Sequence, residues 1–318
     1  MKHRLSLQNI VAASAAIDPA FRDTPQFEAE TLQAELGCRL VVKVETLNPI
    51  RSFKARGAQF LVSQMSGSPH LVCATAGNFG QGMAYAARKR GWPITIFVGA
   101  HANPMKVARM RGLGAMVREG SDDPDELHVE AEAFARKNGF HLVQDGREAA
   151  IAEGAGTIAV ELLRWPKCFD HIVVPLGDGA LLGGMARWIK AQCPTTRVIG
   201  VCATASPAME RSWRSQKVVS APCDGTIAAG IAVGTPFEEA VNDLTGLIDD
   251  VLLVPDSSLI TAMRLAHQEL GVVLEPAGAA GLAAVLDHRE QFRGRLVATV
   301  LTGGNVSPGN LREWFAMA

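Results

Sequence analysis

The sequence predicts an α/β protein built from open, largely parallel sheets, and three observations support this fold class. Strand-like and helical runs alternate along almost the whole chain of 318 residues. Many strand-like runs are continuously apolar, as in HIVVP at 171–175, which is typical of parallel strands covered on both faces. Glycine-rich turns follow several of these runs, and the chain contains 31 glycines. We therefore expect two doubly wound layers whose ligands bind at the carboxyl ends of strands.

Two of the expected helices are marked most clearly. The helix expected at 124–138 has an aspartate before it as a candidate N-cap, and Gly139 follows its end. The helix expected at 256–270 opens at Asp256 and is closed by Gly271, a residue type that suits a helix C-terminus. The expected strands are 39–44, 71–75, 94–98, 115–119, 141–143, 171–175, 197–202, 250–255 and 296–301.

Composition argues against several kinds of partner. The chain is 48% hydrophobic and 20% charged, its net charge is −1, and Lys and Arg form no stripe. We therefore expect no nucleic-acid partner. No run approaches the roughly 18 apolar residues needed to span a bilayer, so no membrane span is expected. The N-terminus faintly resembles a signal peptide, but Ser6, Gln8 and Asn9 interrupt its apolar stretch, and we expect a cytoplasmic protein.

Cysteine and histidine spacing predicts no metal site. None of the six cysteines forms a Cys-x-x-Cys pair, and the eight histidines show no metal-ligand spacing. Because several cysteines lie in apolar runs, we expect buried, reduced thiols. A Gly-x-Gly-x-x-Ala run lies at 153–159, but the residues before it do not read as a strand, which argues against a dinucleotide site. The cysteines are Cys38, Cys73, Cys168, Cys193, Cys202 and Cys223.

The segment NPIRSFKARGA at 48–58 places a lysine at the entrance to a helical run. A nucleophilic lysine must lose its proton, which partial burial and neighbouring positive charge both favour. Arg51 and Arg56 supply the charge, and Phe53 supplies an apolar wall. Lys54 is therefore a candidate nucleophile. The alternative is an ordinary lysine in contact with solvent, because the neighbouring residues alone do not distinguish the two.

Three further segments place a turn of small residues after a strand. The turn in CATAGNFGQGMAYAARKRG at 73–91 offers backbone N–H groups and a helix N-terminus, which suit a carboxylate. The turn in HIVVPLGDGALLGG at 171–184 offers similar groups that suit a phosphate. The run TVLTGGN at 299–305 ends a strand in a hydroxyl residue and two glycines. Each segment alone also fits an ordinary turn between a strand and a helix.

Together and in this order, the four segments resemble the fold-type II pyridoxal 5′-phosphate (PLP) enzymes, and within them the serine/threonine dehydratase family. The resemblance covers nearly the whole chain, from about Thr24 to about Asn305. The sequence Ser-Phe-Lys-x-Arg-Gly at 52–57 is specific for the dehydratase and racemase branch. The resemblance implies PLP as the cofactor, a small amino acid as the substrate, and a homo-oligomer such as a dimer.

The resemblance also implies two doubly wound open-sheet domains with the cofactor in the cleft between them. The large PLP-binding domain would comprise residues 1–64 and 149–318. A small domain of residues 65–148 would be inserted between these two parts, so that Lys54 lies just before it.

The family's residue roles carry over to matching positions of this chain. Lys54 matches the lysine that forms the Schiff base and shuttles the Cα proton, and Glu275 matches an acidic residue near the active site. No metal is implied, because Cys202 stands where the family's cation site has an acid. The implied cofactor-binding residues are Lys54, Phe53, Asn78, Gly177, Asp178, Gly179, Ala180, Leu181 and Thr302, the last beside the pyridine nitrogen. The implied substrate-binding residues are Ser52, Thr75, Ala76, Gly77, Asn78 and Phe79.

The implied reaction is the β-elimination of water from a small β-hydroxy amino acid, with a 2-oxo acid and ammonia as products. This makes the chain a PLP-dependent lyase, an amino acid dehydratase or ammonia-lyase. A β-replacement synthase is one alternative, which the flank of Lys54 disfavours. A racemase is another, although Ala76 stands where the racemases carry a serine. A third alternative is a PLP binder without catalytic activity.

Two departures from the family pattern bear on these alternatives. Phe79 stands where most dehydratases have a histidine, which leaves room for a bulkier substrate such as phenylserine. Asp178 and Ala180 stand where the family's phosphate-binding turn has glycines. Because an aspartate repels a phosphate, we expect the Asp178 side chain to point away and its backbone N–H to serve.

Overall fold

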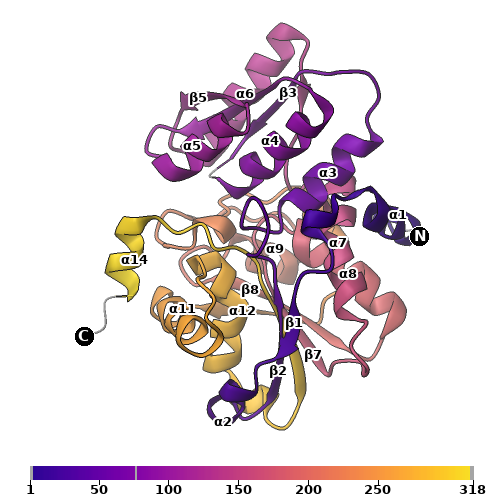
Figure 1. Ribbon diagram of the computed structural model, residues 1–318, viewed down its shortest axis with the longest axis vertical. Coiled ribbons are helices and arrows are strands. Elements are labelled where there is room, and N and C mark those ends of the chain that lie inside the picture. The colour runs from indigo at the N-terminus through magenta and orange to yellow at the C-terminus, as the bar shows by residue number, and fades with distance from the viewer. Residues whose placement is uncertain (1–2, 76, 316–318) are drawn as a thin grey trace.

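The computed structural model describes residues 3–75 and 77–315. It contains two open β-sheets flanked by α-helices, one above the other in Figure 1. In the larger sheet the strand order is β1-β2-β10-β7-β8-β9, and in the smaller sheet it is β5-β4-β3-β6. All neighbouring strands are parallel except β1, which pairs with β2 in the antiparallel direction. The strands are β1 Gln26–Glu28, β2 Arg39–Val44, β3 Leu71–Ala74, β4 Ile94–Gly99, β5 Met116–Gly120, β6 His141–Leu142, β7 His171–Pro175, β8 Arg197–Ala203, β9 Asp250–Val254 and β10 Leu296–Leu301.

Helices connect these strands in the alternation that the sequence predicts, and the α/β fold class is confirmed. The α-helices are α1 Leu7–Ala16, α2 Gln33–Leu36, α3 Ala55–Gln64, α4 Asn78–Arg90, α5 Pro104–Gly112, α6 Pro124–Asn138, α7 Ala149–Leu162, α8 Ala180–Gln192, α9 Ala208–Ser215, α10 Glu238–Leu244, α11 Asp256–Leu270, α12 Pro276–Asp287, α13 Arg289–Phe292 and α14 Pro308–Phe315.

The clearest expected helices coincide with α6 and α11. Asp123 caps α6 by accepting hydrogen bonds from the backbone N–H groups of Asp125 and Glu126. Gly139 then ends α6 in the left-handed conformation, with φ at 67°. The helix α11 opens at Asp256 and ends before Gly271, as expected, and the Asp256 carboxylate accepts hydrogen bonds from the Thr226 hydroxyl and the Ile227 N–H.

Each of the nine expected strands is present, and β1 is an additional strand that the sequence pattern did not predict. The strand β1 spans only three residues at the edge of the sheet, and Phe27 at its centre is exposed. Three residues are too few for a periodic pattern in the sequence. Residues 26–28 are extended mainly because they pair with β2.

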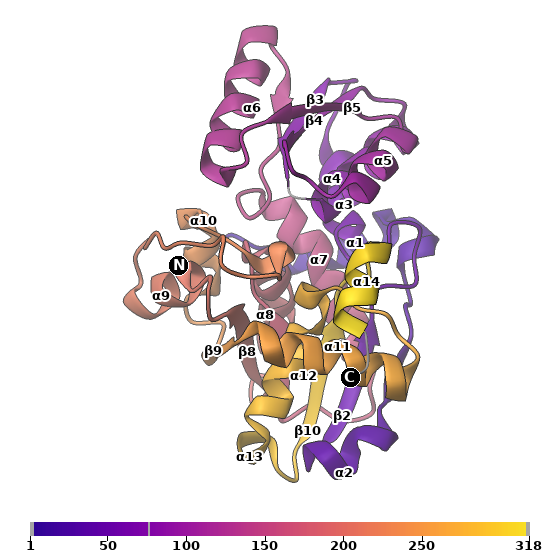
Figure 2. The same ribbon diagram turned by 90° about the vertical axis from the view of Figure 1, so that its left-hand side faces the viewer.

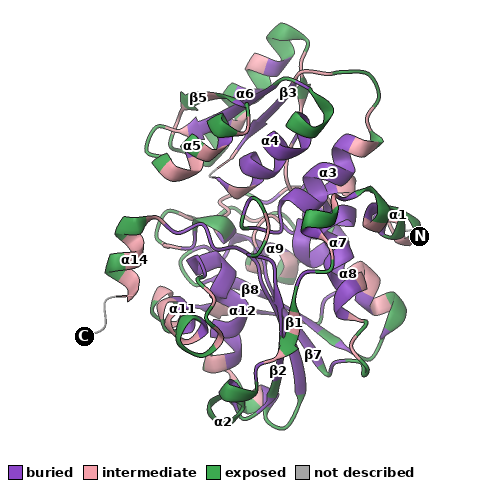
Figure 3. Cartoon of the chain, viewed as in Figure 1, coloured by how far each residue is buried: buried purple, intermediate pink, exposed green. Residues whose placement is uncertain are grey.

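Both faces of the larger sheet are covered, which explains its continuous apolar strands (Figures 2 and 3). Helices α11 and α12 contribute to the buried cluster on one face, and α7 and α8 contribute to the cluster on the other. Every residue of β7 and β10 is consequently buried.

Glycines in α7 let this helix approach two neighbours closely. A Cβ atom on Gly154 would lie 2.7 Å from the carbonyl oxygen of Arg56 at the start of α3. One on Gly156 would lie 2.8 Å from the carbonyl oxygen of Gly184 in α8. The Gly-x-Gly-x-x-Ala run therefore lies inside a helix and serves helix packing, in keeping with the argument against a dinucleotide site.

The expectation of six reduced thiols is wrong for one pair. Cys168, in the connection between α7 and β7, forms a disulfide with Cys193 at the end of α8. Their Cα atoms lie 6.1 Å apart although the two residues are 25 positions apart in the chain, so spacing alone could not reveal the pair. Cys38, Cys73 and Cys202 are buried and free, as expected.

The smaller sheet is formed by strands that lie between residues 71 and 142, with α4, α5 and α6 around it (Figure 1). The domain limits at residues 64/65 and 148/149 stay a prediction. Among the described residues, no helix is long and apolar enough to cross a membrane. Nor does this part of the chain contain a group of three or more His, Cys, Asp or Glu side chains that could hold a metal ion.

Candidate active site

A cavity of about 370 Å³ lies between the two sheets, at the carboxyl ends of β3, β7 and β10. Most of the residues singled out in the sequence line it, although they come from five distant segments. Ser52 and Ala180 are not among its lining residues, and Ala76 lies outside the described part of the chain. The expected site residues that line the cavity are Phe53, Lys54, Thr75, Gly77, Asn78, Phe79, Gly177, Asp178, Gly179, Leu181, Glu275 and Thr302.

Lys54 occupies the position just before α3, and its ammonium group is held between two carboxylates. Nζ lies 2.6 Å from Oδ2 of Asp145 and 2.6 Å from Oδ2 of Asp178. The ring of Phe53 lies beside it, with 5.0 Å between Nζ and the ring centroid. Burial lowers the pKa of Lys54, but the two carboxylates more than offset burial, so the pKa is raised above its ordinary value.

The expectation that neighbouring arginines lower the pKa of Lys54 is therefore wrong. The side chain of Arg56 is fully buried and turns away to Glu45 and Glu161. Arg51 is exposed. The charges that contact Lys54 are negative, and they come from segments far along the chain, which the local flank of the lysine does not reveal.

Arg56 belongs to a buried network that fixes the base of α3. Its Nε lies 2.8 Å from Glu45 and its Nη1 lies 2.7 Å from Glu161. Lys43 lies 2.6 Å from Glu161, so two cations face two carboxylates. Burial raises the pKa of Glu161, but Arg56 and Lys43 outweigh burial and bring it down to about 2. The network ties β2 and α7 to the start of α3 and thereby positions Lys54.

The turn before α8 has the backbone features of a candidate anion site. Gly179 has a φ of 93°, and a Cβ on Gly177 would lie 3.0 Å from Cα of Ile231, so both positions favour glycine. The first N–H groups of α8 have no acceptor within the helix. Oδ1 of Asp178 accepts a hydrogen bond from the Ala180 N–H at 2.9 Å. The expectation that the Asp178 side chain points away is thus wrong: the carboxylate caps α8 and reaches into the cavity toward Lys54.

The turn after β3 brings Asn78 to the start of α4, where several polar groups converge. Glu275 accepts a hydrogen bond from the side-chain amide of Asn78. The amide of Asn305 donates to Oδ1 of Asn78 at 2.9 Å. The backbone N–H of Gly77 donates to Oγ1 of Thr75 at 3.0 Å. Since Glu275 opens α12 and Asn78 opens α4, these contacts join the parts of the chain that carry the two sheets.

Phe79 lines the cavity but is only 4% exposed. Its ring belongs to the apolar cluster of the smaller sheet, together with Met83 and Met110. Phe79 therefore mainly serves packing, although it also lines the cavity.

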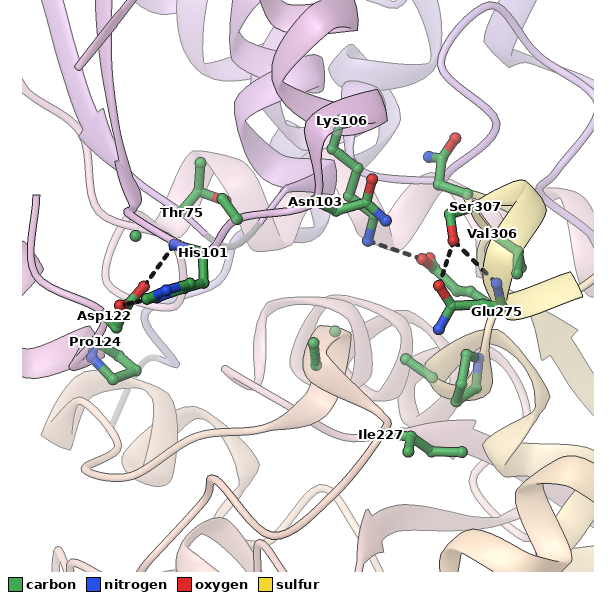
Figure 4. Close-up of a pocket in the computed structure, with 18 of the residues that line it drawn as sticks. Thr75, His101, Asn103, Lys106, Asp122, Pro124, Ile227, Glu275, Val306 and Ser307 are labelled. Carbon is green, nitrogen blue, oxygen red and sulfur yellow. Dashed lines mark hydrogen bonds and ion pairs between the residues drawn. The ribbon is translucent and has the colours of Figure 1, made fainter. Parts of the chain in front are cut away.

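A second cavity of about 370 Å³ shares Thr75, Lys106 and Glu275 with the first. Figure 4 shows Lys106 reaching from α5 toward Glu275, and their charged groups lie 3.1 Å apart. The cavity continues from there to His101, which pairs with Asp122, and to α14. The two cavities together form one cleft that extends well beyond the polar groups around Lys54.

The sequence reasoning missed three polar residues of this site: Asp145, Lys106 and Asn305 as a side-chain ligand of Asn78. Asp145 follows β6, and the carboxyl ends of parallel strands commonly carry functional residues. Burial, followed by the charge of Asp178, raises the pKa of Asp145 to about 7, although Lys54 opposes this shift. Its Oδ1 atom is buried and has no hydrogen-bond partner among the described residues.

Comparison with known proteins connects this geometry with one family. A family model described as "Pyridoxal-phosphate dependent enzyme" matches residues 17–303. An L-threo-3-hydroxyaspartate ammonia-lyase from Pseudomonas sp is 32% identical over 304 residues, which is 95% of this chain and 95% of that protein. An L-threonine ammonia-lyase from Thermotoga maritima is 31% identical over 305 residues, 95% of this chain and 76% of that protein.

Solved structures give the same result. The structure of a threonine deaminase from T.th. has a TM-score of 0.89 and 32% sequence identity, and the match covers 95% of this chain and 99% of that one. The structure of maize serine racemase has a TM-score of 0.91 and 26% identity, with 97% and 96% of the two chains covered.

Proposed function

Because this chain belongs to the family of pyridoxal-phosphate dependent enzymes, we propose that it eliminates water from a small β-hydroxy amino acid and releases a 2-oxo acid and ammonia. Two relatives of this chain are named ammonia-lyases, for L-threo-3-hydroxyaspartate and for L-threonine, and both substrates carry a hydroxyl on Cβ. The observation that carries the proposal is the place of Lys54, in a cavity beside the anion-binding end of α8.

The residues of the cavity fit PLP. Lys54 is the candidate for covalent attachment, and the N-terminus of α8 is the candidate for the phosphate. The Asp178 carboxylate already occupies that helix end as an anion, which supports its use by a phosphate. Thr302 lies at the end of β10 and lines the same cavity, so a neutral hydroxyl is available for the ring nitrogen. When bound, PLP supplies an electron sink for the pair left at Cα.

The chain's own residues bind the substrate and move the proton. We assign the substrate carboxylate to the turn of Thr75, Gly77 and Asn78, where backbone N–H groups meet the N-terminus of α4. Lys54, as the neutral amine, accepts the Cα proton. Its ammonium form is then stabilised by Asp145 and Asp178, because both carboxylates lie at hydrogen-bond distance from Nζ.

A substrate panel tests the proposal. The purified holoenzyme is incubated with L-serine, L-threonine, L-threo-3-hydroxyaspartate and phenylserine, and 2-oxo acid and ammonia are measured together. We expect the two products in equal amounts from at least one substrate. Formation of a thioether from an added thiol would instead indicate β-replacement, and no product from any substrate would indicate a binder without activity.

The particular substrate, the location and the assembly are further parts of the proposal. The second cavity beyond Lys106 and Glu275 offers space for a polar or aromatic substituent on Cβ of the substrate.

We also propose that the protein is a cytoplasmic homodimer. Cell fractionation tests the location, and light scattering tests the assembly. The disulfide of Cys168 with Cys193 gives an independent test of the location: alkylation of fresh cell lysates should find both residues as thiols if the protein lies in a reducing cytoplasm.

A further inference from the structure

Asp145 and Asp178 share the ammonium group of Lys54, but their remaining oxygens have different surroundings. Oδ1 of Asp178 accepts the Ala180 N–H at the positive end of α8. Oδ1 of Asp145 is buried and has no hydrogen-bond partner within residues 3–75 and 77–315. Two neighbouring carboxylates do not both ionise readily, and a proton stays on the one that receives fewer hydrogen bonds. The surroundings therefore favour an ionised Asp178 and a protonated Asp145.

The direction of the pKa shifts agrees with this assignment. Burial raises the pKa of Asp145 to about 7, with a further contribution from Asp178. Burial also acts on Asp178, but Lys54 and the Ala180 N–H outweigh it and lower the pKa of Asp178. Cys73 in β3 is another titratable neighbour of Asp145, and its thiol stays neutral because burial raises its pKa.

A protonated carboxyl in this position meets a need of the proposed reaction, on which this inference rests. Hydroxide is a poor leaving group, so a β-hydroxyl departs readily only when an acid protonates it. The cavity lined by Lys54 is also lined by Asp145, so the base at Cα and the acid adjoin one another. We propose that Asp145 is the general acid that protonates the departing β-hydroxyl.

The proton balance closes within the two residues. Lys54 takes the Cα proton, and the electron pair of that bond forms the new bond between Cα and Cβ. The bond between Cβ and oxygen breaks with its pair on oxygen, and the Asp145 proton completes the water molecule. The ionised Asp145 then pairs with the Lys54 ammonium across the 2.6 Å contact. The proton then passes from the Lys54 ammonium back to Asp145 across the same contact, which restores the starting state of both residues.

The test compares leaving groups in Asp145→Asn. A β-hydroxy substrate needs the acid, whereas the β-chloro analogue with the same skeleton expels chloride without a proton. We expect kcat for water elimination to fall about 100-fold to about 10,000-fold, and the loss with the β-chloro analogue to be at least ~10-fold smaller. Asp178→Asn is the matched control, because it removes the other carboxylate on Lys54 and should affect both leaving groups equally.

Two readouts on the wild type keep the inference testable if the variant folds poorly. In the cofactor-free protein, ¹³C NMR of labelled aspartate should show a carboxyl that titrates near pH 7. In the holoenzyme, water elimination should decline above the pKa of this acid, and chloride elimination should lack that decline.

Three results would overturn the assignment. Equal losses of kcat for both leaving groups in Asp145→Asn would mean that Asp145 positions Lys54 and donates no proton. Absence of an aspartate carboxyl that titrates near neutral pH would mean that Asp145 is not protonated and cannot act as the acid. If the wild type expels chloride but never water, the proposed dehydratase function fails along with the acid. If the wild type eliminates water normally but Asp145→Asn loses equal activity with both leaving groups, the dehydratase function stands and only the role of Asp145 as the acid is contradicted.

Discussion

Oδ2 of Asp178 lies 2.6 Å from Nζ of Lys54, so a carboxylate bridges the candidate covalent site and the N-terminus of α8. This contact places an anion where the phosphate of the cofactor is proposed to bind. The carboxylate must therefore move aside or tolerate a second anion when PLP enters, and either requirement weakens cofactor binding.

Asp178→Gly should accordingly bind PLP more tightly than the wild type. Removal of one negative charge from a partly buried anion site is expected to lower the dissociation constant by about 10-fold, equivalent to about 1.4 kcal/mol. Titration of the cofactor-free protein, followed by visible absorption, measures the constant. Asp178→Asn separates charge from side-chain volume. An unchanged constant in both variants would mean that the phosphate binds elsewhere.

Lys54→Ala should lose covalent attachment of the cofactor. Borohydride reduction of the wild type followed by peptide mass spectrometry should locate the cofactor on Lys54, because this amine lies in the cavity beside the anion site. Lys106→Ala is the matched control, since Lys106 is another amine lining the same cavity but is paired with Glu275. Cofactor mass on Lys106 in the wild type would contradict the assignment.

Stability should fall in acid because of Glu161. Its pKa is about 2 in the folded protein against 4.5 ordinarily, so folding is favoured by its ionised form. This contribution is fully present above pH 4.5 and is lost as the pH falls toward 2, and it amounts to about 3 kcal/mol. Urea unfolding of Glu161→Gln at a series of pH values should show a flatter dependence. Glu290→Gln should change the slope much less, because solvent screens its exposed pair with Arg293.

Arg56→Met should destabilise the fold strongly, since it leaves two carboxylates, Glu45 and Glu161, without their guanidinium. Removal of one partner from a buried charge network costs about 3–5 kcal/mol. Denaturant unfolding of the cofactor-free protein measures the loss. Arg39→Met is the control, because Arg39 forms an ion pair with Glu28 at the surface. Loss of that pair should lower the free energy of unfolding only slightly. Similar losses in the two variants would contradict a special role for the buried network.

Most of the fold could be predicted from the sequence because parallel strands covered on both faces leave a direct pattern. Runs such as HIVVP are apolar throughout, since helices pack on both sides of β7. The edge strand β1 leaves no such pattern in its three residues. The disulfide of Cys168 with Cys193 depends on the spatial return of α8 beside the start of β7, which neither cysteine signals locally.

The site could be predicted only in part, for a similar reason. Turns after strands are local, and so Lys54, Asn78 and Gly177 are visible in the sequence. The charges around Lys54 are not local, because Asp145 is 91 positions away and Asp178 is 124 positions away. The flank of Lys54 predicts a lowered pKa, whereas the tertiary contacts raise it.

The choice between elimination and racemisation is expected to depend on Ala76. This residue lies outside the described part of the chain, but its neighbours Thr75 and Gly77 line the cavity. Racemisation requires a second acid that delivers a proton to the opposite face of Cα, and an alanine side chain has no proton to give. The wild type should therefore form little D-serine from L-serine, and Ala76→Ser should raise that rate.

Chiral analysis of reactions with L-serine measures both products, D-serine and pyruvate. A positioned proton donor contributes about 100-fold to about 10,000-fold in rate, so a partial gain in Ala76→Ser is measurable above the wild-type background. Ala76→Val is the matched control, because it adds similar volume without a hydroxyl. If the wild type already forms D-serine as fast as pyruvate, another group donates the second proton, and the Lys54 amine is then not the only proton carrier at Cα.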